Sequence, residues 1–192
     1  MDQMFGSFVQ QEEGHGEYLK LGFHPTSVPL QQRWRNNGLS ADFLAGYVST
    51  FFPGQDPAST ARQADIKDAI SFIANELLEN AMKYSFASSQ HTVIIEMFLD
   101  PDAIRLYTVN CIAQERIAPF QLFIGRLLTE DTNDLYTEQL ERNAESDSES
   151  ASGLGFLTML NDYGVALAWK FARRDAPGGS DVDVTTMVRL PV

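Results

Sequence analysis

Three polar side chains with chemical potential recur at helical spacing between residues 72 and 85. Glu76, Asn80 and Lys83 are separated by four and three positions, so a helix of about 3.6 residues per turn places them in one narrow stripe. A second, apolar stripe lies about a quarter of a turn away and consists of Ile66, Ile70, Ile73, Leu77, Ala81 and Tyr84. A carboxylate, an amide and an ammonium group therefore lie beside the core face, where a pocket can form between a helix and a sheet.

A second chemically informative segment is ASGLGF, residues 151–156. Gly153 and Gly155 allow backbone N–H groups to approach an anion closely, and the start of the helix predicted to follow adds unpaired donors and a favourable dipole. Together these features suit a phosphate group. The same pattern, taken alone, is also typical of a glycine pair in a loop that precedes a helix.

The elements that must position these residues follow from periodicity and turn residues. Residues 1–16 are predicted to be irregular. Asn36, Asn37 and Gly38 are predicted to end one helix, with Ser40 capping the next, and Ser59 or Thr60 is predicted to begin the long helix that carries Glu76. Strands are expected at 18–24, 91–99, 103–110, 165–171 and 182–190, and helices at 30–36, 41–52, 60–86, 114–129, 132–144 and 154–162.

This order contains two antiparallel hairpins and several helices, which indicates an α+β protein rather than a doubly wound parallel sheet. We expect a two-layer sandwich in which helices cover one face of a mixed, mostly antiparallel sheet of about five strands. Five aromatic residues in the predicted helical pair either cover the open face of the sheet or form a surface for a partner or a homodimer. They are Trp34, Phe43, Tyr47, Phe51 and Phe52.

Composition excludes several classes of function. The chain has 192 residues, of which 44% are hydrophobic, and a formal net charge of −12. Such a charge argues against nucleic acid and against an anionic membrane surface as partners. The single cysteine, Cys111, excludes an internal disulfide framework and is expected to be buried. No signal peptide and no apolar run of membrane-spanning length is recognisable, so we expect a cytoplasmic protein.

The order of these motifs resembles the GHKL superfamily of ATPases and kinases. The segment ELLENAMKYS, residues 76–85, matches the E-x-x-x-N-A-x-K-[HY]-S form of the family's N box, and SGLGF matches most of its glycine box. The resemblance implies a Bergerat, or histidine-kinase-like, ATP-binding domain over residues 60–192. Residues 1–59 would then be a strand and a helical segment packed on this domain or extending it.

The resemblance also implies roles for individual residues of the N box. Asn80 would hold the Mg²⁺ ion that bridges the phosphates of ATP, because an amide oxygen is a suitable ligand for a hard cation. Glu76 would be the general base that activates water or a substrate hydroxyl opposite the γ-phosphate. Lys83 would offset phosphate charge.

In the glycine box, the resemblance assigns ATP binding to Ser152, Gly153, Leu154 and Gly155. Residues 141–152, which are acidic and rich in serine, would form the lid over the nucleotide. A lid is a segment that closes on its ligand.

The sequence departs from the family pattern at three positions. Asn110 stands where the family has the aspartate that recognises the adenine amine, and Ile112 stands where it has a glycine. Ala151 replaces the first glycine of the glycine box. Asn110 can still accept a hydrogen bond from an amine through its carbonyl oxygen, but without the assistance of a charge.

Within the superfamily, the chain is most similar to the anti-sigma-factor type of serine/threonine kinase, in its SiaB-like bacterial branch. The resemblance implies an ATP-dependent kinase that phosphorylates a small STAS-domain-like antagonist, or another signalling protein, and switches partners. The three departures favour an alternative, a degenerate module that regulates by protein docking with weak or no ATP binding. A third interpretation is an output domain that passes phosphate to a response regulator.

Overall fold

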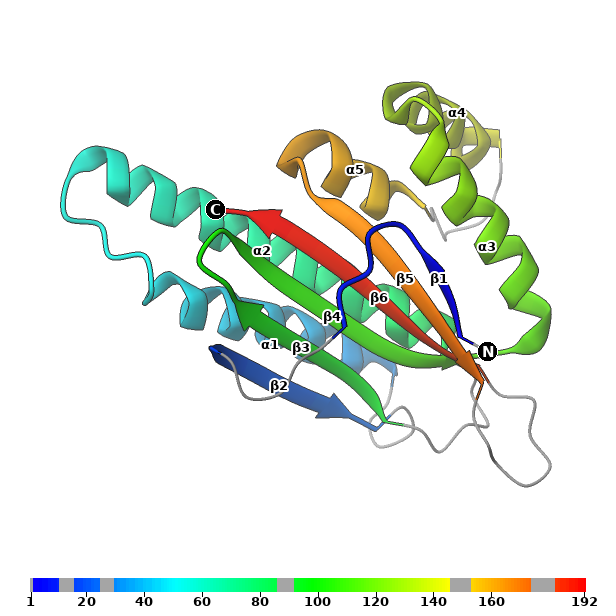
Figure 1. Ribbon diagram of the computed structural model, residues 1–192, viewed down its shortest axis with the longest axis horizontal. Helices are drawn as coiled ribbons and strands as arrows, with labels where there is room; N and C mark the ends of the chain where they lie inside the picture. Colours follow the sequence, from blue (N-terminus) through cyan, green and yellow to red (C-terminus); the bar gives the residue numbers. More distant parts are fainter. Residues whose placement is uncertain (1, 11–15, 25–29, 86–91, 146–152, 174–181) are drawn as a thin grey trace.

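The computed structural model describes residues 2–10, 16–24, 30–85, 92–145, 153–173 and 182–192. Helices cover one face of a single sheet (Figure 1). The strands are β1 (Gln3–Phe5), β2 (Glu17–Phe23), β3 (Val93–Leu99), β4 (Ala103–Ile112), β5 (Ala166–Arg173) and β6 (Val182–Pro191). The helices are α1 (Leu30–Ser49), α2 (Pro57–Tyr84), α3 (Gln114–Thr129), α4 (Thr132–Glu145) and α5 (Leu154–Tyr163).

The sheet has six strands in the order β1-β5-β6-β4-β3-β2, and every pair is antiparallel. The predicted α+β sandwich is therefore confirmed, with one strand more than expected and no parallel pair among the described strands. β4 and β6 occupy the centre and pair from Ala103 with Pro191 to Ile112 with Val182. Alternate residues of these strands point into the helical layer, which sets the face on which a pocket can form.

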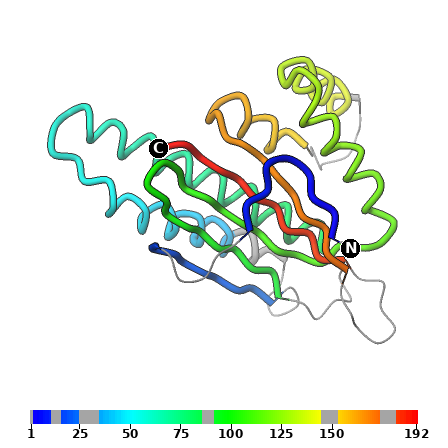
Figure 2. The backbone as a smooth tube through the Cα atoms, in the orientation of Figure 1, coloured from blue at the N-terminus to red at the C-terminus, as the bar shows by residue number. Residues whose placement is uncertain are grey.

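The extra strand lies in the segment expected to be irregular. β1 pairs with β5, and the chain after it crosses the face of the sheet that carries no helix (Figures 1 and 2). Phe8 packs edge-on against Tyr107 there, and the Tyr107 hydroxyl donates a hydrogen bond of 3.0 Å to the carbonyl oxygen of Val9. The sequence of residues 1–16 does not reveal this strand because the partner that stabilises it is distant in the chain.

α2 begins earlier than expected. Its N-cap is Asp56, whose carboxylate accepts hydrogen bonds of 2.9 Å from the backbone N–H groups of Ala58 and Ser59. The Ser59 hydroxyl accepts one in return from the Asp56 N–H, which completes a capping box. Pro57 occupies the first turn, where its missing N–H costs nothing. The apolar stripe is confirmed as the core face, since Ile66, Ile70, Ile73, Leu77 and Ala81 are all buried.

α1 is one helix rather than the expected two. Asn37 is buried in its middle, and the Ser40 hydroxyl donates to the Asn36 carbonyl oxygen instead of capping a new helix. Packing explains the difference: α1 lies along α2 (Figure 1) and buries an apolar face against it. Burial of that face outweighs the low helix propensity of the Asn-Asn-Gly segment. The buried face consists of Ala41, Leu44, Ala45 and Val48.

The aromatic residues near the N-terminus have different environments. Tyr47 and Phe52 are half-buried and pack against the core, whereas Phe43 and Phe51 are exposed. The side chain of Trp34 lies outside the described part of the structure. Whether the exposed pair meets a partner, and whether residues 1–59 and 60–192 act as separate units, stay predictions. In the described part of the chain, no helix combines the length and the apolar character needed to cross a membrane.

Candidate functional site

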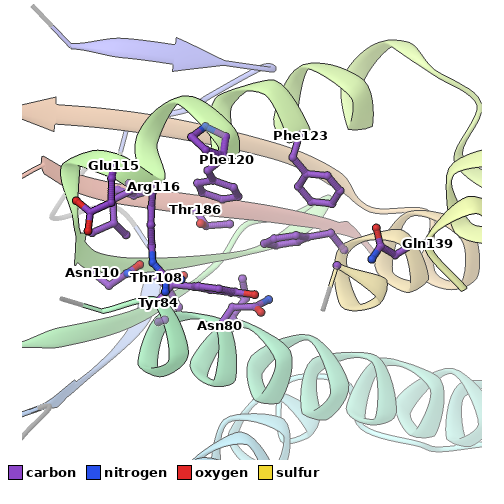
Figure 3. A pocket seen from close by; sticks show the side chains of 17 residues that line it. Asn80, Tyr84, Thr108, Asn110, Glu115, Arg116, Phe120, Phe123, Gln139 and Thr186 are labelled. Atoms are coloured by element: carbon purple, nitrogen blue, oxygen red, sulfur yellow. The ribbon is translucent and has the colours of Figure 1, made fainter. Parts of the chain in front are cut away.

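A cavity of about 370 Å³ lies between α2, α3 and the inner face of the sheet (Figure 3). This volume falls in the range of about 300–1,000 Å³ that is typical of small-molecule sites. Apolar and aromatic side chains form most of the wall, and polar side chains come from α2, α3, α4 and the sheet. The lining residues are Leu77, Asn80, Ala81, Tyr84, Thr108, Asn110, Ile112, Glu115, Arg116, Pro119, Phe120, Phe123, Gln139, Gly153, Phe156, Val184 and Thr186.

The sheet contributes three buried polar side chains to the cavity. Thr108, Asn110 and Thr186 are only 2%, 7% and 5% exposed, yet their side chains form no hydrogen bond with any residue that the structure describes. Thr108 and Thr186 are paired directly across β4 and β6, and Asn110 follows Thr108 on the same face. Buried polar groups are normally hydrogen-bonded, so these three are available to a ligand. Asn110 thus lines the cavity, and its contact with a ligand stays a prediction.

Asn80 reaches the cavity from α2. It is half-buried and its amide forms no hydrogen bond among the described residues. A free amide oxygen beside an open volume fits the expected role of a magnesium ligand, because Mg²⁺ uses few protein ligands and takes the remainder from water and phosphate. Between residues 2 and 192, the described portions contain no group of three His, Cys, Asp or Glu side chains arranged to hold a metal.

Glu76 lies one turn before Asn80 and faces the start of α5. A Cβ atom placed on Gly155 would be only 2.0 Å from Oε2 of Glu76 and 2.9 Å from its Cδ. The two motifs found in the sequence, 79 positions apart, are therefore in direct contact, and only glycine fits at 155 while the carboxylate keeps this position. Burial raises the pKa of the Glu76 carboxyl, and the neighbouring charge of Glu79 raises that pKa further.

Gly153 is the residue of the glycine box that lines the cavity. It caps α5 with φ +93°, a left-handed conformation that favours glycine, and Gln139 of α4 and Phe123 of α3 approach it. Gly153 therefore lies between the start of α5 and side chains of α3 and α4 at the edge of the cavity. Gln139 marks this end of the cavity in Figure 3, whereas Asn110 lies at the other end.

The remaining predicted site residues lie outside the cavity wall. Leu154 is half-buried, and Lys83 is exposed with its Nζ 5.4 Å from the centre of the Tyr84 ring. Gly155 contacts the Glu76 carboxylate instead of the open volume. Ser152 falls outside the described residues, as does the predicted lid from residue 146 onward, while residues 141–145 form the last part of α4.

The start of α3 brings two charged residues to the rim near Asn110. Glu115 and Arg116 line the cavity and are exposed, and the Arg116 guanidinium carbon lies 5.5 Å from the centre of the Tyr84 ring. Phe120 and Phe123 follow on the same helix and point toward the cavity (Figure 3). An aromatic pair above a polar sheet wall can enclose a flat heteroaromatic ring.

Sequence reasoning missed the two threonines and all of the α3 residues. A signal for the threonines exists: the inward positions of β4 read Ile104, Leu106, Thr108, Asn110, and Thr186 interrupts the same apolar series in β6. A polar residue at an inward position of an alternating strand is a candidate for a ligand contact. The α3 residues carry no comparable signal, because their position depends on how that helix packs.

No family model matches the sequence, and no curated protein matches it. Among solved structures, the fold is similar to that of a chain in the crystal structure of the SiaB–SiaC complex from Pseudomonas aeruginosa. The TM-score is 0.56 at 15% sequence identity, and the match covers 91% of this chain and 89% of that chain. At this identity the likeness shows the fold alone. The structure thus has the α+β fold of that chain, with an open antiparallel sheet of six strands and five described helices.

Proposed function

We propose that the chain is an ATP-binding regulatory protein that transfers the γ-phosphoryl group to a serine or threonine of a partner protein. The observation that carries this proposal is the meeting of the two sequence motifs in one place. Asn80 and Gly153 line the same cavity, and Glu76 contacts Gly155 beside it. In this proposal the adenine lies at the Asn110 end of the cavity and the phosphates lie toward Asn80 and α5.

In this proposal, Glu76 accepts the proton of the substrate hydroxyl. The hydroxyl oxygen forms a bond to the γ-phosphorus while the bond between that phosphorus and the β–γ bridging oxygen breaks, and ADP leaves. The raised pKa of the Glu76 carboxyl makes it a stronger base than an exposed carboxylate. Mg²⁺ held by Asn80 would neutralise phosphate charge. The dipole at the start of α5 favours negative charge at the same place.

The proposed partner is a signalling protein, in the first instance a small STAS-domain-like antagonist. Two observations support a protein partner. The structural neighbour comes from a complex of two proteins, and the described surface of this chain exposes several large apolar side chains outside the cavity, including Leu39 and Phe43 on α1. A homodimer through the same helix is the other arrangement that such a surface allows.

Phosphotransfer tests the proposed chemistry. We expect Glu76→Ala to lower transfer to the partner by about 10²- to 10⁴-fold, the usual contribution of a general base, while Mg²⁺–ATP still binds. Radiolabelled ATP and a purified candidate partner give the rate, and calorimetry gives the affinity. Asp65→Ala is the matched control, because it removes an exposed carboxylate from the same helix, and it should retain transfer. Undiminished transfer by Glu76→Ala would exclude the assigned role.

A second candidate function is that of a docking module with little or no nucleotide binding. Asn110 and Ile112 favour it, because both line the cavity at the end where the family has an aspartate and a glycine. Calorimetry with ATP and Mg²⁺ separates the two functions. Micromolar binding that is lost in Asn80→Ala supports the kinase, whereas no heat of binding with the folded wild-type protein supports the docking module.

A further inference from the structure

The buried polar side chains of the cavity wall share one property, which is that each can both donate and accept hydrogen bonds. Thr108, Asn110 and Thr186 each carry groups that can both donate and accept hydrogen bonds: a hydroxyl does so by rotation, and an amide does so through its two ends. All three are more than nine-tenths buried and lack partners among the described residues. No bond within the described protein therefore fixes these groups as donors or as acceptors, and each can take either role according to the ligand group that faces it.

An aspartate at position 110 would behave differently. An ionised carboxylate only accepts hydrogen bonds, so it selects an amino group on the ligand and leaves a carbonyl oxygen facing a negative charge. Asn110 can accept from an amino group or, with its amide turned over, donate to a carbonyl oxygen. Asn110 lines the cavity and can bond a ring through either end of its amide, so it lacks the fixed polarity that would discriminate between an amino group and a carbonyl oxygen.

The rim of the cavity also offers both a hydrogen-bond donor and an acceptor. Glu115 and Arg116 line the cavity side by side at the end occupied by Asn110 (Figure 3), one an acceptor and the other a donor. Both are exposed, so water screens their charges and neither imposes a single polarity on the buried wall. Phe120 of α3 points toward the cavity (Figure 3) and can contact the ring of any purine, whichever group stands at C6.

We propose that the cavity binds purine nucleoside triphosphates with little selectivity for the group at C6, so that GTP and ITP bind about as well as ATP. Asn110 determines this selectivity for the group at C6. The inference rests on the proposed nucleotide-binding function. The physical reason is the cost of an unpaired polar group. A wall that only accepts hydrogen bonds leaves a carbonyl oxygen at C6 without a donor. A wall whose groups can donate or accept can bond either an amino group or a carbonyl oxygen at C6.

The experiment is a calorimetric titration of the full chain with Mg²⁺ and ATP, GTP or ITP in turn. We expect the three wild-type dissociation constants to agree within about tenfold, because the buried wall can either accept from an amino group or donate to a carbonyl oxygen at C6. In Asn110→Asp, GTP and ITP should weaken by about tenfold to a hundredfold relative to ATP, since their C6 oxygen then faces a carboxylate.

Two further variants keep the test sound if Asn110→Asp folds poorly. Thr186→Val keeps the side-chain shape and removes a wall hydroxyl, so it should weaken ATP and GTP alike by a few-fold. Thr185→Val is the matched control, because the adjacent residue of β6 points to the opposite face and does not line the cavity. It should leave all three affinities unchanged.

The outcomes separate this inference from the function on which it rests. Wild-type protein that binds ATP at least a hundredfold more tightly than GTP and ITP overturns the relaxed selectivity and leaves nucleotide binding in place. Wild-type protein that binds none of the three overturns both. Comparable binding of all three, with a split in Asn110→Asp or an equal loss in Thr186→Val, supports the inference.

Discussion

At the scale of single residues, the contact between Glu76 and Gly155 links stability to chemistry. The carboxylate is partly removed from water and forms no hydrogen bond among the described residues. Burial raises the pKa of the carboxyl above that in the unfolded chain, so the folded state binds its proton more tightly. The free energy of unfolding therefore falls as the pH rises from below the unfolded pKa through the folded pKa. At neutral pH the ionised Glu76 carboxylate destabilises the folded state.

Glu76→Gln should accordingly raise the melting temperature at pH 7. The difference from wild type should shrink as the pH falls through the folded pKa and vanish below the unfolded one, because both chains then carry a neutral group. Thermal unfolding between pH 4 and pH 8 measures this, with phosphotransfer assayed in parallel and expected to be lost. A melting temperature that falls in Glu76→Gln at pH 7 would show that the carboxylate is stabilising instead.

Gly155→Ala tests the same contact from the other helix. The new methyl group would overlap the far end of the Glu76 side chain, which can swing away, so we expect a loss of less than about 1 kcal/mol in unfolding free energy. Phosphotransfer should fall by about 10²-fold, since a displacement of about 1 Å is enough for such a loss. Gly125→Ala, in a helix with no atom near the added methyl, is the control and should keep activity.

At the scale of elements, α1 shows how packing overrides local propensity. The Asn-Asn-Gly segment sits inside a continuous helix because the turns after it bury an apolar face against α2. Gly38 has no conformational reason to be glycine there: its φ is not positive, and a Cβ would meet no atom within 4 Å. It only adds entropy to the unfolded chain.

Gly38→Ala should therefore stabilise the protein by about 0.5–1 kcal/mol, as measured by chemical denaturation. Gly164→Ala provides the contrast. A Cβ at this position also meets open space, but Gly164 ends α5 with φ +60°, a conformation that disfavours alanine. We expect this variant to lower stability. Destabilisation by Gly38→Ala would mean that the helix is interrupted at this position in solution.

At the scale of the whole molecule, the two faces of the sheet have different coverings. The five described helices and the cavity lie on one face, and the segment after β1 crosses the other (Figure 1). There Phe8 packs against a small buried cluster of Phe98, Tyr107, Ala168 and Met187. The Tyr107 hydroxyl holds this segment, because it donates to the Val9 carbonyl and accepts from Arg105 at 3.1 Å. These contacts connect Phe8 and Val9 to the outer face of β4.

Tyr107→Phe should lower the unfolding free energy by about 0.5–1.5 kcal/mol, because it removes the hydrogen bond to the Val9 carbonyl oxygen, while Arg105 keeps its bonds to Asp100. Amide hydrogen exchange at Val9 should accelerate as the segment is released. Tyr18→Phe is the control on the same face, because Tyr18 is 53% exposed and its hydroxyl forms no hydrogen bond among the described residues. Unchanged exchange at Val9 in Tyr107→Phe would show that the backbone pairing of β1 suffices.

The sequence by itself determined the elements and the motifs. Local patterns can be recognised from the sequence alone. They include the apolar periodicity of α2, the two antiparallel hairpins and the spacing of Glu76 and Asn80. The same holds for Asn110 on an inward strand position. What it left open were features whose causes are distant: the pairing of β1 with β5 and the continuity of α1.

Only the tertiary structure decided which candidate residues share one cavity. Asn80, Asn110 and Gly153 come together because α2, β4 and α5 pack around one volume, while Lys83, Leu154 and Gly155 face elsewhere. Contact between Glu76 and Gly155, and the enclosure of Thr108 and Thr186 under α3, likewise depend on helix packing. Burial and side-chain direction are properties of the packed layers, so spacing along the chain restricts them without fixing them.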